Sequence, residues 1–153
     1  MSEILSLQTI RLQVSVASKE DAIRQAGELL VQGGCVLPAY IDGMLAREKS
    51  MSTFVGNGVA IPHGQFDDLS LVKRTGISVL QVPAGIEWEP GNIAYLLVGI
   101  AATSNEHIKV LANLAKVVED ENNARHLAQT TDPEIVLKYL NPQPRKKKAE
   151  ASE

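Results

Sequence analysis

The spacing of hydrophobic residues changes along the first third of the chain, and each spacing predicts a different element. Apolar and polar residues alternate strictly in residues 10–16, which predicts a strand with one buried face. From Ser18 to Gly33 and Gly34 the apolar residues recur at helical spacing, and an acidic residue three positions after the serine completes a capping pattern. A proline in the first turn then opens a second, less regular helix over residues 38–49.

A turn with a histidine at its far end follows these helices. Residues 52–55 and 59–61 read as two short strand segments around a Gly-Asn-Gly turn, where the glycines supply positive φ angles. The second segment runs directly into Pro62, His63 and Gly64. We therefore expect the histidine to leave a buried apolar run and enter a turn bounded by proline and glycine.

The most hydrophobic stretches of the chain lie in its second half. Residues 65–73 are mixed and are expected to be irregular, whereas residues 75–82 are rich in β-branched and aliphatic side chains and predict a strand that ends at Pro83. Residues 84–92 contain two glycines and a proline and predict a loop. The almost unbroken apolar run over residues 93–102 predicts a central strand buried on both faces.

The remaining chain predicts helices and then a tail. A Thr-x-x-Glu capping box opens a helix over residues 103–118, and further helices are expected over residues 121–129 and 132–140. We expect one domain over residues 1–141 and a disordered linker or tail over residues 142–153, which has no apolar side chain larger than alanine. Strands interspersed with helices indicate an α/β layered architecture with a mixed sheet.

Composition excludes several classes of function. With 153 residues, 44% hydrophobic side chains and a net charge of −3, the chain fits one compact core and gives no general electrostatic case for binding nucleic acid. Cys35 is the single cysteine, so no internal disulfide forms, and no cysteine–histidine cluster has metal-ligand spacing. No stretch is long and apolar enough to span a bilayer. We expect a soluble, cytoplasmic protein without a metal or a cofactor.

Three histidines and one arginine are the candidates for chemistry. His63 lies at a strand end beside a glycine that leaves room for a partner, although a turn histidine satisfied by the backbone is an equal alternative. His107 falls in or beside the first turn of a predicted helix, where the dipole favours anions; a simple polar helix start is the alternative. Arg47 can bind a phosphate through two parallel hydrogen bonds or merely complement its helix dipole. His126 is expected on a solvated helix face.

Familiar nucleotide and hydrolase motifs are absent from the sequence. The chain has neither a Walker A loop nor a dinucleotide fingerprint, and the Gly-Asn-Gly segment is more simply a turn. No serine lies in a Gly-x-Ser-x-Gly elbow. The sequence therefore indicates neither a recognisable nucleotide site nor a serine hydrolase site.

Three segments together resemble a known family. The segments are MLAREK (residues 44–49), GNGVAIPHG (residues 56–64) and GIAATSNEH (residues 99–107). In this order they resemble the IIA domain of the bacterial sugar phosphotransferase system, fructose/mannitol type. The resemblance extends over almost all of the chain that is expected to fold, and the Pro-His-Gly segment corresponds to the position that the family phosphorylates.

The resemblance implies a fold, a reaction and partners. It implies an α/β sandwich with a central mixed sheet flanked by helices, in which His63 accepts phosphate from the phosphocarrier protein HPr, as a tele-phosphohistidine, and passes it to a cysteine of a IIB domain. Arg47 and His107 would lie near the phosphoryl group. A neutral imidazole is needed for attack, so we expect a backbone carbonyl near Pro62 or in the following loop to hold the proton of the other ring nitrogen.

The resemblance leaves two questions open. Related IIA-like domains also serve as regulatory phosphorylation sensors, in a nitrogen-related branch or inside transcription activators, and a vestigial interaction domain is a further alternative. The choice between fructose and mannitol is not set by these residues, because in this family the sugar binds in the membrane IIC domain. The Gly-Asn-Gly and Met-Leu-Ala-Arg-Glu segments look slightly closer to fructose-type domains fused to an HPr-like module, for which the tail would be a linker.

Overall fold

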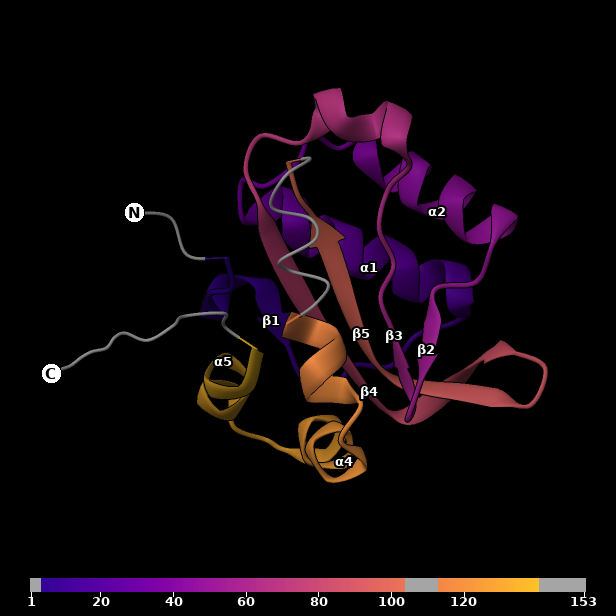
Figure 1. The fold of residues 1–153 in the computed structure, drawn as a ribbon, viewed down its shortest axis with the longest axis vertical. Helices are drawn as coiled ribbons and strands as arrows, with labels where there is room; N and C mark the ends of the chain where they lie inside the picture. Colours follow the sequence, from indigo (N-terminus) through magenta and orange to yellow (C-terminus); the bar gives the residue numbers. More distant parts are fainter. Residues whose placement is uncertain (1–3, 104–112, 141–153) are drawn as a thin grey trace, which may run out of the picture.

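A mixed β-sheet forms the centre of the fold in the computed structural model, which describes residues 4–103 and 113–140. Among these residues, five strands lie in the order β1-β4-β5-β3-β2 (Figure 1). The strands are β1 (Ile10–Arg11), β2 (Phe54–Gly56), β3 (Val59–Ala60), β4 (Gly76–Glu89) and β5 (Asn92–Ala101). β1 is parallel to β4 and β3 is parallel to β5, whereas the β4–β5 and β2–β3 pairs are antiparallel. The prediction of a mixed sheet is confirmed.

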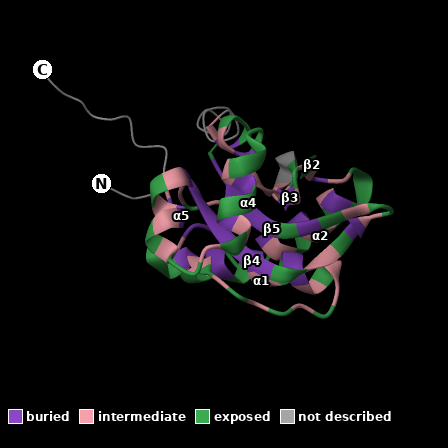
Figure 2. Ribbon diagram, turned by 90° about the horizontal axis from the view of Figure 1, so that it is seen from below, coloured by how far each residue is buried: buried purple, intermediate pink, exposed green. Residues whose placement is uncertain are grey.

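Helices cover both faces of this sheet (Figures 1 and 2). The helices α1 (Lys19–Gln32) and α2 (Tyr40–Ser50) lie on one face, and α4 (Glu121–Gln129) and α5 (Pro133–Leu140) lie on the other. The buried cluster under α1 and α2 includes Ile23, Leu30, Met44, Leu80 and Leu97. The cluster on the opposite face includes Ile77, Val98, Leu127, Val136 and Leu140. The predicted layered α/β sandwich is therefore the observed fold.

Three of the predicted helices begin at side chains that cap them. Ser18 Oγ accepts a hydrogen bond from the Asp21 amide at the start of α1, and Asp120 caps α4 through its carboxylate. Asp132 accepts a hydrogen bond from the Glu134 amide at the start of α5. These bonds satisfy amides that no earlier helical carbonyl can reach. The predicted first turn of the helix at the Thr-x-x-Glu capping box falls outside the described residues, among which residues 113–118 are helical.

The strand predicted over residues 10–16 is much shorter than expected. Only Ile10 and Arg11 are in β1, because Gln13 adopts a positive φ of 57° that breaks the extended backbone. Alternating exposure nevertheless continues through residue 16, and the Val14 amide donates to the Gln81 carbonyl. The alternation in residues 10–16 therefore corresponds to a segment at the edge of the sheet, of which only the first two residues pair as a regular strand.

The loop predicted over residues 84–92 is wrong, because β4 continues through Pro83 to Glu89 and forms a long hairpin with β5. The register between these strands shifts between Gln81 and Ile86, so the proline lies where no regular ladder bond is needed. Gly85, with a φ of 79°, lies in the same irregular stretch. Pro83 and Gly85 therefore mark a bulge within a strand that continues, and the turn lies only between the end of β4 and the start of β5.

The central position of β5 agrees with the prediction for the apolar run. Residues 96–101 are buried, whereas Ile93 and Tyr95 near the hairpin end are exposed.

The segment expected to be irregular before β4 contains a 3-10 helix, η2 (Phe66–Leu71). Cys35 is buried, and that burial raises the pKa of its thiol, against the smaller opposing effect of Arg74. Within residues 4–103 and 113–140, no helix is both long and apolar enough to cross a bilayer.

Candidate functional site

His63 lies where the chain leaves β3 alongside the central strand. β3 runs parallel to β5, and beyond its last residue the Pro62 carbonyl accepts a hydrogen bond of 2.9 Å from the Ile100 amide. His63 itself forms an isolated parallel bridge with Ile100. The histidine is thus held at the edge where the carboxyl ends of two parallel strands meet, which is a common position for functional groups in α/β folds.

The ring of His63 is oriented by a neighbouring carbonyl. Its Nδ1 lies 2.8 Å from the carbonyl oxygen of Ile61. A carbonyl oxygen only accepts hydrogen bonds, so Nδ1 carries the proton, and in the neutral ring the lone pair is on Nε2. This agrees with the expectation that a backbone carbonyl near Pro62 fixes the tautomer. The ring is chemically prepared for nucleophilic attack by Nε2.

Tyr40 clamps the backbone on the other side of the histidine. Its side chain is buried, with 4% of the residue exposed, and its hydroxyl donates to the Ile100 carbonyl (2.8 Å) and accepts from the Gly64 amide (2.9 Å). A Cβ atom at Gly64 would lie 2.6 Å from Tyr40 Cε1, so this position needs glycine while the tyrosine is in place. The clamp therefore fixes the residue after His63 to the strand beside it.

The electrostatic setting keeps the Tyr40 hydroxyl protonated. Burial is the largest cause and raises the pKa of Tyr40 to about 12, and the negative charge of Asp68 acts in the same direction. The hydrogen bond from the Gly64 amide lowers the pKa, but it is outweighed. The hydroxyl is therefore a neutral donor to the Ile100 carbonyl throughout the physiological pH range.

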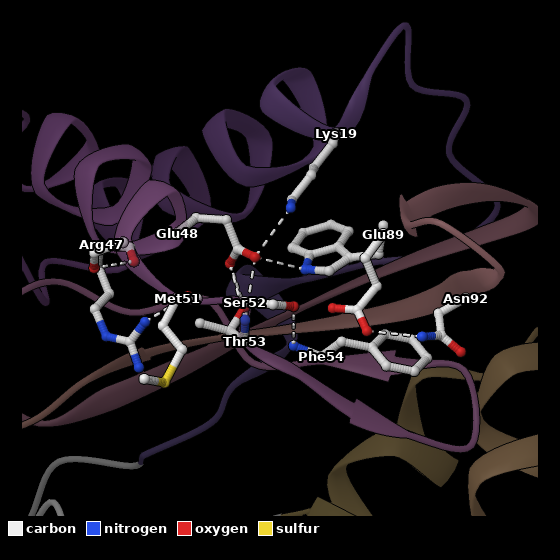
Figure 3. Close-up of polar contacts among 11 residues, drawn as sticks. Lys19, Arg47, Glu48, Met51, Ser52, Thr53, Phe54, Glu89 and Asn92 are labelled. Carbon is white, nitrogen blue, oxygen red and sulfur yellow. Dashed lines mark hydrogen bonds and ion pairs between the residues drawn. The ribbon is translucent and has the colours of Figure 1, made fainter.

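Arg47 lies near the C-terminal end of α2, two turns beyond Tyr40. Its Nη1 atom donates a hydrogen bond of 2.6 Å to the carbonyl of Met51 (Figure 3). The chain then continues to Thr53, whose carbonyl accepts a 3.0 Å hydrogen bond from the Ile61 amide. Arg47 is thus bound to the segment that pairs with the backbone preceding His63. One bond to Met51 occupies only part of a guanidinium fork that has five N–H donors.

The other two histidines have different outcomes. His107 lies outside the described residues, so its role stays a prediction from the sequence. His126 is exposed on α4, where its Nδ1 lies 3.2 Å from the Tyr139 hydroxyl and the two rings meet edge to face. The prediction that His126 occupies a solvated helix face is confirmed.

Sequence reasoning gave no role in the site to Tyr40 or Glu48, the two side chains that buttress this region from α2. Glu48 is buried and binds Thr53. The available signal for Tyr40 was its position seven residues before Arg47, which places both on one face of a helix. For Glu48 no pattern in the sequence separates a buried carboxylate from the charged residues on either side of it.

The chain matches a known family over nearly its full length. Residues 3–142 match the family described as "Phosphoenolpyruvate-dependent sugar phosphotransferase system, EIIA 2". The chain belongs to this family. The resemblance seen in the three sequence segments is therefore confirmed, and the matched range contains all of the described residues.

This EIIA 2 domain is similar to single-domain proteins, to parts of longer proteins and to solved structures. It is 42% identical, over 90% of its length and 95% of the relative's, to the "Mannitol-specific phosphotransferase enzyme IIA component" of Geobacillus stearothermophilus. It is 51% identical, over 84% of its length, to the "Multiphosphoryl transfer protein" of Haemophilus influenzae, of which it spans only 26%. A solved complex of IIA mannitol with phosphorylated IIB mannitol from Escherichia coli matches with a TM-score of 0.83 and 42% identity, over 88% of this chain and 95% of that one.

Proposed function

We propose that this chain is a phosphoryl carrier of the bacterial sugar phosphotransferase system, accepting phosphate from phospho-HPr on His63 and passing it to a cysteine of a IIB domain. The observation that carries the proposal is the hydrogen bond between His63 Nδ1 and the Ile61 carbonyl in a chain of the EIIA 2 family. That bond supports Nε2 as the nucleophile, because it assigns the lone pair of the neutral ring to this nitrogen.

Each transfer exchanges one bond to phosphorus for another. In the first, the Nε2 lone pair of His63 attacks phosphorus, the P–N bond to the donor histidine breaks, and its electron pair returns to the donor ring. In the second, a IIB thiolate attacks, and the P–N bond to His63 breaks in the same way. The Nδ1 proton stays on the ring, and its bond to the Ile61 carbonyl strengthens as positive charge develops.

Charge on the phosphoryl oxygens needs cationic or donor groups near His63. The transition state places that charge on the three equatorial oxygens, and a guanidinium matches two of them at once. We assign this role to Arg47, whose guanidinium binds the segment that pairs with the backbone before His63, and a second donor role to His107 on the sequence motif alone. No cofactor or metal is assigned, because a phosphohistidine donor already carries the transferable group.

The names of the relatives support the partners that we propose. The complex of IIA with phosphorylated IIB supports a IIB domain as acceptor, and the multiphosphoryl transfer proteins support fusion to further phosphotransferase modules. Residues 142–153 would then be a linker. The names of two relatives favour mannitol as the transported sugar, with fructose as the alternative. We propose the cytoplasm as the setting of this relay, as expected from the sequence.

The proposal is tested by transfer in two steps. The whole chain is incubated with phosphoenolpyruvate, enzyme I and HPr, and radiolabelled phosphate on the chain is counted before and after addition of a mannitol-type or a fructose-type IIB domain. We expect close to one phosphate per chain, which moves to one of the two IIB domains. A chain that takes no label contradicts the carrier function, and label that moves to neither IIB domain contradicts the transport relay.

Arg47→Lys is expected to slow transfer from phospho-HPr by about tenfold or more without unfolding the domain. Lysine keeps the positive charge but offers a point donor in place of a planar fork. Single-turnover phosphorylation measures the rate, and thermal unfolding checks the fold. Lys49→Arg on the same helix end is the matched control and should leave the rate unchanged. An Arg47→Lys rate equal to that of the wild type removes the arginine from the site.

A further inference from the structure

Glu48 is a buried carboxylate that takes no part in the chemistry proposed for His63. It lies in α2 directly after Arg47, and only 7% of the residue is exposed. Burying an ionised carboxylate is costly unless donors surround it, so a charge in this position needs an explanation. The hydrogen-bond donors around Glu48 provide that explanation.

Donors from three other segments converge on this carboxylate. The donors are the Thr53 amide at 3.1 Å, the Thr53 hydroxyl at 2.5 Å, Trp88 Nε1 at 2.9 Å and the ammonium group of Lys19 at 3.1 Å (Figure 3). Lys19 also lies over the Trp88 ring, 5.1 Å from its centroid. The Glu48 carboxylate therefore links the start of α1, the end of α2 and the far part of β4. Its bonds also fix Thr53.

A continuous chain of hydrogen bonds leads from this charge to the candidate nucleophile. Glu48 accepts from the Thr53 amide, and the Thr53 carbonyl accepts from the Ile61 amide at 3.0 Å. The carbonyl of Ile61 in turn accepts a hydrogen bond from His63 Nδ1 at 2.8 Å. Each bond constrains the residue whose carbonyl accepts the next one, so the place of the Ile61 carbonyl depends on where Glu48 holds Thr53.

We propose that Glu48 is a positioning residue for His63, acting through Thr53 and Ile61. It touches no reacting atom; it holds the Ile61 carbonyl where that oxygen keeps the proton on Nδ1 and the lone pair on Nε2. The two neutral tautomers of imidazole are close in energy, so a displaced carbonyl lets the proton move to Nε2 and removes the lone pair from the nucleophilic nitrogen. The inference rests on the function proposed for His63.

The direct test is Glu48→Gln, read out on the His63 ring. Glutamine keeps the shape but loses the charge and one acceptor oxygen, and in either orientation of its amide the NH2 group faces the Thr53 amide donor. Nitrogen-15 NMR of the neutral ring reports the tautomer, and single-turnover labelling by phospho-HPr reports the rate. We expect nearly pure Nδ1–H in the wild type, a mixture of tautomers in the variant, and a rate lower by about tenfold, the usual size of an effect from an outer-shell partner.

Three variants separate positioning from general stability. Trp88→Phe removes one donor to Glu48 but leaves both Thr53 bonds, and Val136→Ala loosens the core on the opposite sheet face. Neither should change the tautomer. Thr53→Val keeps the side-chain volume and removes only the hydroxyl bond, so it should shift the tautomer in the same direction as Glu48→Gln and by less. If Glu48→Gln does not fold, the tautomer measured in Thr53→Val tests the proposal in its place.

A wild-type tautomer in both Glu48→Gln and Thr53→Val overturns the proposal, as does an equal change in Val136→Ala. The tautomer measurement needs no phosphoryl donor. If the wild type takes no phosphate, the proposed function fails, yet the ring signals still decide whether Glu48 positions His63.

Discussion

Replacing His63 with alanine is expected to reduce labelling of the chain by phospho-HPr to background, a loss of more than about 1000-fold. The reason is chemical: the variant lacks the only group assigned to form a bond to phosphorus. The fold should survive, because the His63 side chain is half-buried and its ring bond to Ile61 links residues only two apart. Radiolabelling at equal concentrations of folded protein measures the effect.

His126→Ala is the matched control for this experiment. His126 is exposed on α4 and contacts Tyr139, so its removal should leave labelling unchanged. Equal labelling of His63→Ala and the wild type would move the acceptor to another residue and would contradict the assignment. Loss of labelling in both variants would indicate damage to a partner surface or to the fold in place of loss of the nucleophile.

Tyr40→Phe is expected to lower the free energy of unfolding by about 1–3 kcal/mol and to slow phosphorylation of His63. The variant keeps the ring in the core but leaves the Gly64 amide and the Ile100 carbonyl without the hydroxyl that bridges them. Urea unfolding measures the stability, and single-turnover labelling measures the rate. A change below about 0.5 kcal/mol would show that water replaces the hydroxyl at no cost.

The stability difference between the wild type and Tyr40→Phe should also depend on pH in a defined window. Burial raises the pKa of Tyr40 from 10.0 to about 12, so above pH 10 the unfolded chain loses this proton while the folded chain keeps it. The advantage of tyrosine is therefore fully present below pH 10 and is lost as the pH rises through about 12. Tyr139→Phe, on α5, serves as the control because it leaves the Tyr40 clamp intact.

Local signals in the sequence predicted the helices better than the strands. Ser18 and Asp132 act through bonds to amides two or three residues away, so a single sequence contains all the information that they need. Pro83 shows the limit. A proline usually ends a strand, but whether a strand continues past it depends on the partner strand, which here shifts register at that point.

In the candidate site too, local features were predictable from the sequence and long-range contacts were not. His63 and its turn are adjacent in sequence to the carbonyl that orients the ring, so the residue and its tautomer partner were both predictable. Tyr40 reaches Ile100 across 60 positions, and Glu48 reaches Trp88 across 40. Such contacts arise only when the helices pack on the sheet, and a buried acid in an otherwise charged helix end gives no periodic signal.

The account depends most directly on which nitrogen of which histidine carries the phosphate. Nitrogen-15 and phosphorus-31 NMR of the chain phosphorylated by phospho-HPr resolves this, with His63→Ala used to assign the signal. We expect a single phosphohistidine at His63, with phosphorus bonded to Nε2 and the proton of Nδ1 held by the Ile61 carbonyl. Phosphate on Nδ1 of His63, or on any other residue, would contradict the account.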